Sequence, residues 1–242
     1  MALPRWLRAS DFEFRYRSPL NLVHFAIAYF AYYFDDINIV QGMVWWFADG
    51  DESRARTISH LIFAFGALLV GLAAAIRTWA SAYIRSSVVH DRDMHTTTLV
   101  ADGPYRWVRN PLYLGTFLLT IGIGFLMSRL GFAILVIGGG IRILRLIGRE
   151  EAEFASQHGE RFREFCRRVP RLIPALRPRV PAGGIEPHWG QAFWGEAFMW
   201  GFFLGMLVFA VTLQTRITWI VLGGAPAIWF LQNILRLGRN TA

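Results

Sequence analysis

The chain has 242 residues, of which 54% are apolar and only 17% are charged, and its mean hydropathy is +0.35. A soluble domain usually contains about 25% charged residues, so this composition excludes a soluble enzyme, a disordered chain and a disulfide scaffold. All 25 basic residues are arginine, and the formal charge is +8. Their clustering favours the cytoplasmic side of a membrane and anionic lipid head groups over nucleic acid.

Six apolar stretches are candidates for transmembrane helices, because about 20 residues are needed to cross a bilayer. They are residues 19–34, 57–79, 112–127, 130–147, 191–213 and 218–235. The acidic, tryptophan-containing residues 35–52 are expected to connect the first two. Arginines gather before the first stretch, between the second and third, and after the fourth, so the positive-inside rule places these segments and both termini in the cytoplasm. We predict an all-α, polytopic integral membrane protein.

The arginine-rich section after the fourth stretch has its own pattern. Residues 149–158 and 160–169 each predict a short helix, with a break at Gly159. Five prolines between 170 and 187 then indicate an irregular linker. We expect N-terminal transmembrane helices in 1–95, a catalytic module in 96–180, and a linker with a transmembrane hairpin in 181–242. Gly201 and Gly205 form a GxxxG pattern that predicts close packing of this hairpin against the rest.

The first candidate for chemistry is residues 96–113, where a membrane stretch begins. Gly103-Pro104 and Asn110-Pro111 are turn-forming pairs, which leave backbone groups free for a polar cofactor at the water–lipid boundary. An ordinary interfacial aromatic belt is the alternative explanation for the aromatic residues in this segment.

The second candidate is the end of the fourth stretch. Arg142, Arg145 and Arg149 share one helix face by their spacing, and Glu150 and Glu153 lie on a neighbouring face. Such carboxylates and guanidiniums could bind a ligand ammonium and a ligand anion. A helix end with surface salt bridges is the alternative.

Other polar groups are weaker candidates. His90, Asp91, Asp93 and His95 match no common metal pattern, and we expect a solvated loop and no metal site there. Glu196 is an ionisable residue at the start of an apolar stretch, which makes it a functional candidate, although we expect it to reach the interface.

The two main candidates occur in the order of a known family. GPYRWVRNPLY at 103–113, a hairpin, and REEAEFASQHGERFREFCRRVPRLIP at 149–174 together resemble the isoprenylcysteine carboxyl methyltransferases and their phospholipid methyltransferase relatives. The resemblance implies S-adenosylmethionine (AdoMet) as methyl donor, bound at the cytoplasmic face beneath the short helices. It places the cofactor against Thr97, Thr98, Leu99, Val100, Tyr105, Asn110, Pro111, Leu112, Tyr113 and Glu150.

This chain departs from the family pattern at three places. Asn110 replaces a histidine, Phe162 and Phe165 replace a tyrosine pair, and Leu146 stands where the carboxyl methyltransferases have an arginine for the substrate carboxylate. Arg145 or Arg149 is expected to take over that role. Both should also keep Glu150 ionised.

The expected activity is methyl transfer to a membrane-embedded, lipid-like acceptor that resembles an isoprenylcysteine carboxylate. For an amine acceptor such as phosphatidylethanolamine, Glu151 or Glu153 is the candidate base. An NADPH-dependent, sterol-reductase-like enzyme and a non-catalytic membrane scaffold are the remaining alternatives. The expected partners are a lipid-like or prenylated small substrate and membrane lipids.

Overall fold

The computed structural model describes residues 4–84 and 101–216. Over these ranges every regular element is a helix, and β-pairing is limited to an isolated bridge between Asn38 and Ser128. The all-α prediction is therefore confirmed for this part of the chain.

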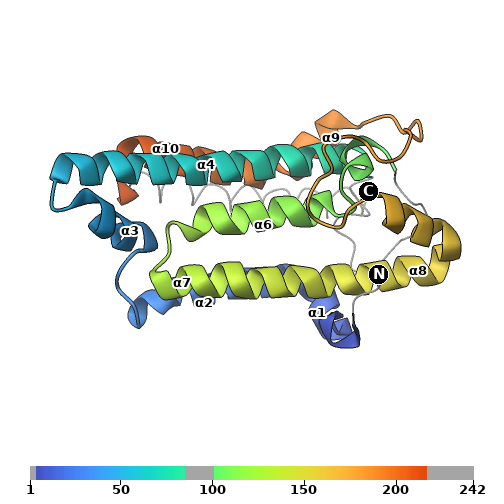
Figure 1. The fold of residues 1–242 in the computed structure, drawn as a ribbon, viewed down its shortest axis with the longest axis horizontal. Helices are drawn as coiled ribbons and strands as arrows, with labels where there is room; N and C mark the ends of the chain where they lie inside the picture. The colour runs from blue at the N-terminus through green and yellow to red at the C-terminus, as the bar shows by residue number, and fades with distance from the viewer. Residues whose placement is uncertain (1–3, 85–100, 217–242) are drawn as a thin grey trace, which may run out of the picture.

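The elements follow one another as short and long helices. In chain order they are η1 (Arg5–Leu7), α1 (Asp11–Arg15), α2 (Arg17–Phe30), η2 (Ala31–Tyr33), α3 (Ile39–Ala48), α4 (Glu52–Ala82), η3 (Gly103–Arg106), α6 (Pro111–Gly124), α7 (Arg129–Ala133), the π-helix η4 (Ile134–Gly138), α8 (Gly139–Arg168), α9 (Trp189–Gly195) and α10 (Ala197–Thr212). The long helices lie alongside one another, with α1, η3 and the second half of α8 at one end and α3 at the other (Figure 1). The arginine-rich segments thus meet at one end of the bundle, as predicted.

Within the described residues, two helices are long and apolar enough to cross a membrane, namely α4 and the continuous helix Arg129–Arg168. The pair α9 and α10, bent by 59°, adds a third if it counts as one span. Six spans are not confirmed. The first and third predicted stretches form the 14-residue helices α2 and α6, about 21 Å long at 1.5 Å per residue, and residues 218–235 lie outside the described residues.

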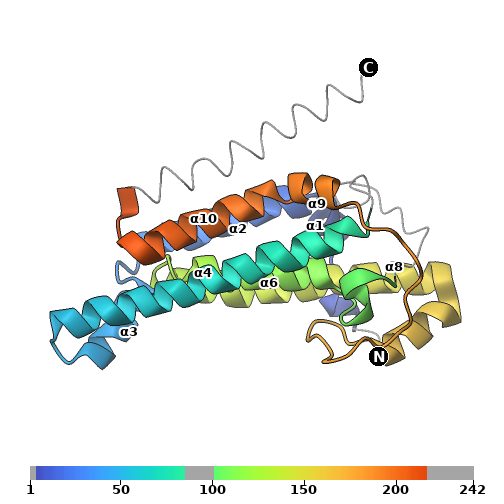
Figure 2. The same cartoon turned by 90° about the horizontal axis from the view of Figure 1, so that it is seen from above.

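The centre of the bundle is α4, which packs most extensively against α6 and α10 (Figure 2). Small residues permit the close contact with α6: a Cβ atom on Gly122 would lie 2.6 Å from Val70 and 2.7 Å from the Gly66 carbonyl oxygen. We expected Gly201 and Gly205 to provide the close face of α10. In the structure Gly66 of α4 faces the Met206 side chain of α10, and the role of Gly201 and Gly205 stays a prediction.

Two predictions about helix boundaries have different outcomes. Gly159 breaks α8 as expected, since its φ of 54° and ψ of −126° are not helical. Residues 35–52 were expected to be a connection, but they contain helix α3. Its first turn is capped by the Asn38 side chain, which accepts hydrogen bonds from the backbone N–H groups of Val40 and Gln41.

Large apolar side chains are exposed along the outside of the bundle. They occur on α2, α4 and α10 and include Leu22, Ile27, Leu61, Leu68, Leu204 and Val211. Such continuous apolar surface is unusual for a protein in water, and contact with lipid chains accounts for it.

Candidate functional site

The first part of α6 meets α8 at the arginine-rich end of the bundle. Pro111 occupies the first turn of α6, where its missing N–H costs no hydrogen bond. This start directs Tyr113 toward α8, and its hydroxyl donates a 2.7 Å hydrogen bond to Glu150 Oε1. The structure therefore brings Glu150 together with the segment Asn110–Tyr113, which the sequence had linked only by resemblance.

Tyr105 belongs to η3, just before α6. Its side chain is buried, and its hydroxyl has no hydrogen-bond partner in the part of the chain that the structure describes. Burial raises the pKa of this phenol well above its usual value, and the charge of Glu150 adds to the effect. The hydroxyl consequently stays protonated and holds a free donor.

Gly103 sets the backbone that leads to Tyr105. Its φ is +53°, and a Cβ atom there would lie 2.3 Å from the Tyr83 ring. Only glycine both adopts this positive φ readily and leaves room for the Tyr83 ring. The glycine of the GPY sequence is therefore required by the packing of η3 against the end of α4.

The segment between η3 and α6 is fastened to the linker that follows α8. Backbone hydrogen bonds join Arg109 N–H to the Pro170 carbonyl and Ala175 N–H to the Trp107 carbonyl, both at 2.9 Å. The Asn110 amide donates to the Arg171 carbonyl at 3.1 Å. Asn110 was expected to face the cofactor. In the structure its side-chain amide donates a hydrogen bond to this linker.

Glu151, the candidate base, is already bound by two guanidiniums. Arg171 donates from Nε to both carboxylate oxygens at 3.1 Å and from Nη2 to Oε2 at 2.7 Å. Arg109 Nη1 lies 3.3 Å from Oε1. The two guanidiniums thus occupy both carboxylate oxygens, and this geometry makes Glu151 an anchor for the linker.

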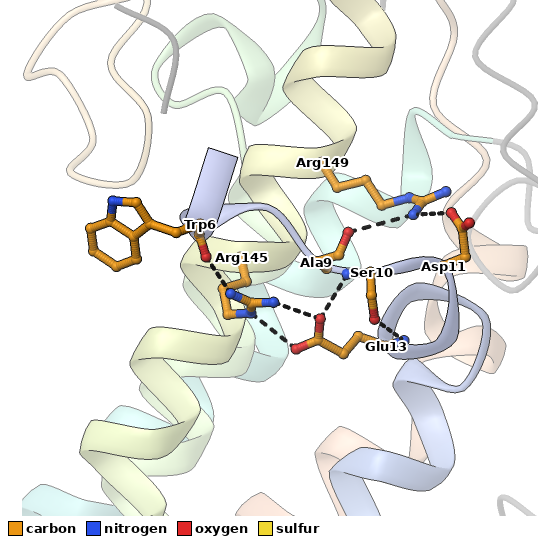
Figure 3. A network of polar contacts seen from close by, with 7 residues as sticks. All are labelled: Trp6, Ala9, Ser10, Asp11, Glu13, Arg145 and Arg149. Carbon is orange, nitrogen blue, oxygen red and sulfur yellow. Dashed lines mark hydrogen bonds and ion pairs between the residues drawn. The ribbon is translucent and has the colours of Figure 1, made fainter. Parts of the chain in front are cut away.

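Arg145 and Arg149 contact the N-terminal segment and not Glu150 (Figure 3). Arg145 donates to both oxygens of Glu13, from Nε at 3.0 Å and from Nη2 at 2.8 Å. Arg149 forms an ion pair with Asp11. The guanidinium of Arg145 lowers the pKa of Glu13 from 4.5 to about 2, and a Ser10–Glu13 capping box holds this short helix in place.

The expected surroundings of Glu150 need correction as a result. Spacing along one helix placed Arg145 and Arg149 beside it, but their carboxylate partners come from α1, over 130 residues away in sequence. Glu150 is partly buried, and the hydrogen bond that reaches it comes from Tyr113. Leu146, at the position of the family arginine, is buried with Ala9 and Phe14.

A buried ion pair near the start of α6 was not predicted. Glu196 is fully buried and accepts two hydrogen bonds from Arg77, at 2.8 and 3.0 Å, and a third from Ser81 at 2.8 Å. Arg77 also donates to Thr116 Oγ1 and to the Leu112 carbonyl. The expectation that Glu196 reaches the interface is wrong, because a partner 119 residues earlier in the chain keeps it inside.

Several predicted residues lie outside the described ranges. They are Thr97, Thr98, Leu99 and Val100 of the expected cofactor segment, and the His90, Asp91, Asp93 and His95 group.

Comparison with known proteins finds a family that matches part of the chain. Residues 61–161, from α4 through most of α8, match the phospholipid methyltransferase family, whose members are integral membrane methyltransferases related to the isoprenylcysteine carboxyl methyltransferases. The match contains Tyr105, the segment Asn110–Tyr113 and Glu150. The resemblance predicted from the sequence is thereby confirmed.

Two curated relatives match the chain over different lengths. The cobalt-zinc-cadmium resistance protein CzcN of Cupriavidus metallidurans is 32% identical over 120 residues, which cover 49% of this chain and 52% of that protein. The nickel-cobalt-cadmium resistance protein NccN of Alcaligenes xylosoxydans xylosoxydans is 26% identical over 172 residues, 67% of this chain and 74% of that protein. The first match therefore spans about half of its relative. No solved structure matches the chain.

Proposed function

We propose that this protein is an AdoMet-dependent methyltransferase acting on a lipid-like acceptor in the membrane. The observation that carries the proposal is the contact between Tyr113 and Glu150 at 2.7 Å, inside the range that matches the family. Beside it, the buried Tyr105 hydroxyl has a donor with no partner among the described residues. A carboxylate and an unused donor at one place fit a ligand that carries both an ammonium and polar acceptors.

Each proposed contact follows from the chemistry of these side chains. Glu150 would accept a charge-assisted hydrogen bond from the methionyl ammonium, and Tyr113 keeps its carboxylate oriented. Tyr105 would donate to an acceptor atom of the cofactor. The remaining expected positions, Asn110, Pro111 and Leu112, lie on the same turn, and the cofactor would supply an electrophilic sulfonium methyl group.

The catalytic role of the protein is then largely to align the acceptor with the methyl group and to exclude water. A carboxylate acceptor is already nucleophilic and needs an orienting guanidinium. For Arg145 or Arg149 to act in this way, each would have to exchange its present carboxylate, Glu13 or Asp11, for the acceptor.

An amine acceptor, as in phosphatidylethanolamine, is the second candidate, and the phospholipid methyltransferase family match favours it. This reaction requires loss of a proton from the ammonium group. Glu151 was the candidate base, but Arg109 and Arg171 already bind its carboxylate oxygens. For this acceptor we assign the proton to solvent at the interface and give Glu151 a positioning role.

The relatives are named for resistance to cobalt, zinc, cadmium and nickel. The part of the proposed site that the structure describes consists of tyrosine, asparagine, glutamate and backbone groups, without histidine or cysteine, the ligands that these softer metals favour. We therefore propose that any contribution of this chain to metal resistance proceeds through methyl transfer at the membrane.

The test is to incubate the purified protein, in nanodiscs of bacterial lipid with added prenylcysteine, with methyl-labelled AdoMet and to identify the labelled product. A labelled prenylcysteine ester or a labelled amino-lipid supports the proposal and names the acceptor. Label in neither fraction, or equal label with Glu150→Gln, contradicts it. Glu160→Gln, an exposed carboxylate further along α8, is the matched control. Oxidation of NADPH in the same nanodiscs would favour the reductase alternative.

A further inference from the structure

Arg142 is the first arginine of α8 and precedes Arg145 and Arg149 in the continuous helix Arg129–Arg168, which is long and apolar enough to cross a membrane. It precedes Glu150 by eight residues, or about 12 Å along the helix axis. Its position is therefore deeper in the bilayer than the proposed cofactor site, at a level that a lipid-like acceptor would occupy.

The guanidinium of Arg142 is not satisfied by the protein. Nε and Nη1 are buried, and neither has a hydrogen-bond partner in residues 4–84 or 101–216. The next two arginines of the same helix face, Arg145 and Arg149, each have a carboxylate. Since a guanidinium does not lose its proton in a protein, Arg142 carries a buried charge without a paired anion, which is costly unless a ligand supplies one.

The described surroundings of Arg142 supply no free carboxylate. The acidic group whose charge reaches Arg142 is Glu13, on α1. Glu13 is already bound through both oxygens by Arg145. The Tyr113 hydroxyl donates to Glu150, and neither Nε nor Nη1 of Arg142 has it as a partner.

We propose that Arg142 binds the anionic group, a carboxylate or a phosphate, of the methyl acceptor. Nε and Nη1 belong to different edges of the planar guanidinium, each shared with Nη2, and either edge matches two oxygens of a single carboxylate or phosphate. The acceptor would then lie with its chain in the bilayer and its charged group about two helical turns below Glu150. The inference depends on the proposed function for the identity of the ligand as the acceptor, but the anion site itself can be tested separately.

The experiment measures binding of three twelve-carbon amphiphiles to the protein in uncharged maltoside micelles: dodecanoate, dodecyl phosphate and dodecanol. The wild-type protein should bind at least one anionic probe more tightly than dodecanol, and the better probe distinguishes a carboxylate from a phosphate site. Arg142→Gln should weaken that binding by about tenfold or more, as expected for hydrogen bonds to a charged group. Arg163→Gln, an exposed arginine of the same helix, should leave it unchanged.

Two further readouts separate this role from a structural one. Without probe, Arg142→Gln should unfold at or above the wild-type temperature, because it removes an unpaired buried charge. A lower unfolding temperature without probe, or unchanged anion binding, would overturn the proposal. AdoMet should bind Arg142→Gln as it binds wild type. If wild type binds the anion through Arg142 but does not bind AdoMet, the anion site is supported and the proposed function fails.

Discussion

The ion pair between Glu13 and Arg145 offers a quantitative test of how the N-terminal segment is held on α8. Its two parallel hydrogen bonds, at 3.0 and 2.8 Å, lower the pKa of Glu13 from 4.5 to about 2. A shift of that size is worth at most about 3.4 kcal/mol at 1.36 kcal/mol per unit. Both side chains are 28% exposed, so screening by solvent reduces the expected value to about 1–2 kcal/mol.

The pH dependence follows from the sign of the shift. Because the pKa of Glu13 is lower in the folded protein, the pair contributes fully above the unfolded value of 4.5, and the contribution is lost as the pH falls toward 2. Glu13→Gln should therefore lower the free energy of unfolding by about 1–2 kcal/mol at pH 7, and the difference from wild type should shrink below pH 4.5. Urea unfolding in maltoside at several pH values measures both. Equal stability at pH 7, or a difference that does not change with pH, would refute the reasoning.

Three further changes test other contacts by thermal unfolding or proteolysis. Glu196→Leu should cost about 3–5 kcal/mol, because it leaves Arg77 buried and unpaired, and adding Arg77→Leu should recover most of the loss; additive effects would contradict the pairing. Gly103→Ala should lower the unfolding temperature more than Gly159→Ala, since both have positive φ but only Gly103 meets a ring; equal losses would show that the contact is unimportant. Arg171→Gln should make residues 170–188 more sensitive to limited proteolysis, and unchanged cleavage would count against the Glu151 anchor.

Helix breaks and helix starts could be predicted from the sequence, because they depend on the residues at that point of the chain. Gly159 and the Asn110-Pro111 helix start follow from properties of the residues themselves, and the structure shows both. That GPYRWVRNPLY and Glu150 belong to one site was predicted from the family resemblance. In the structure the hydrogen bond from Tyr113 to Glu150 joins them.

Partners from distant segments could not be predicted in this way. Spacing along α8 placed Arg145 and Arg149 beside Glu150, yet α1 provides their carboxylates. Glu196 was expected at the interface because nothing near it in sequence neutralises it, whereas Arg77 does so from α4. Helix α3 was missed because acidic and turn residues surround its short apolar run, and its cap, Asn38, also donates to the Met127 carbonyl across the bundle.

The central claim is that the Glu150 carboxylate holds the ammonium of AdoMet, and calorimetric titration of AdoMet into Glu150→Gln tests it most directly. Glutamine keeps the size of the side chain and an oxygen that can accept from Tyr113, so the substitution removes mainly the charge. We expect AdoMet to bind wild type and Glu160→Gln equally and to bind Glu150→Gln roughly 10- to 150-fold more weakly, the range for a hydrogen bond to a charged group. Equal AdoMet affinity in wild type and Glu150→Gln, or no AdoMet binding to the wild-type protein, would contradict the account.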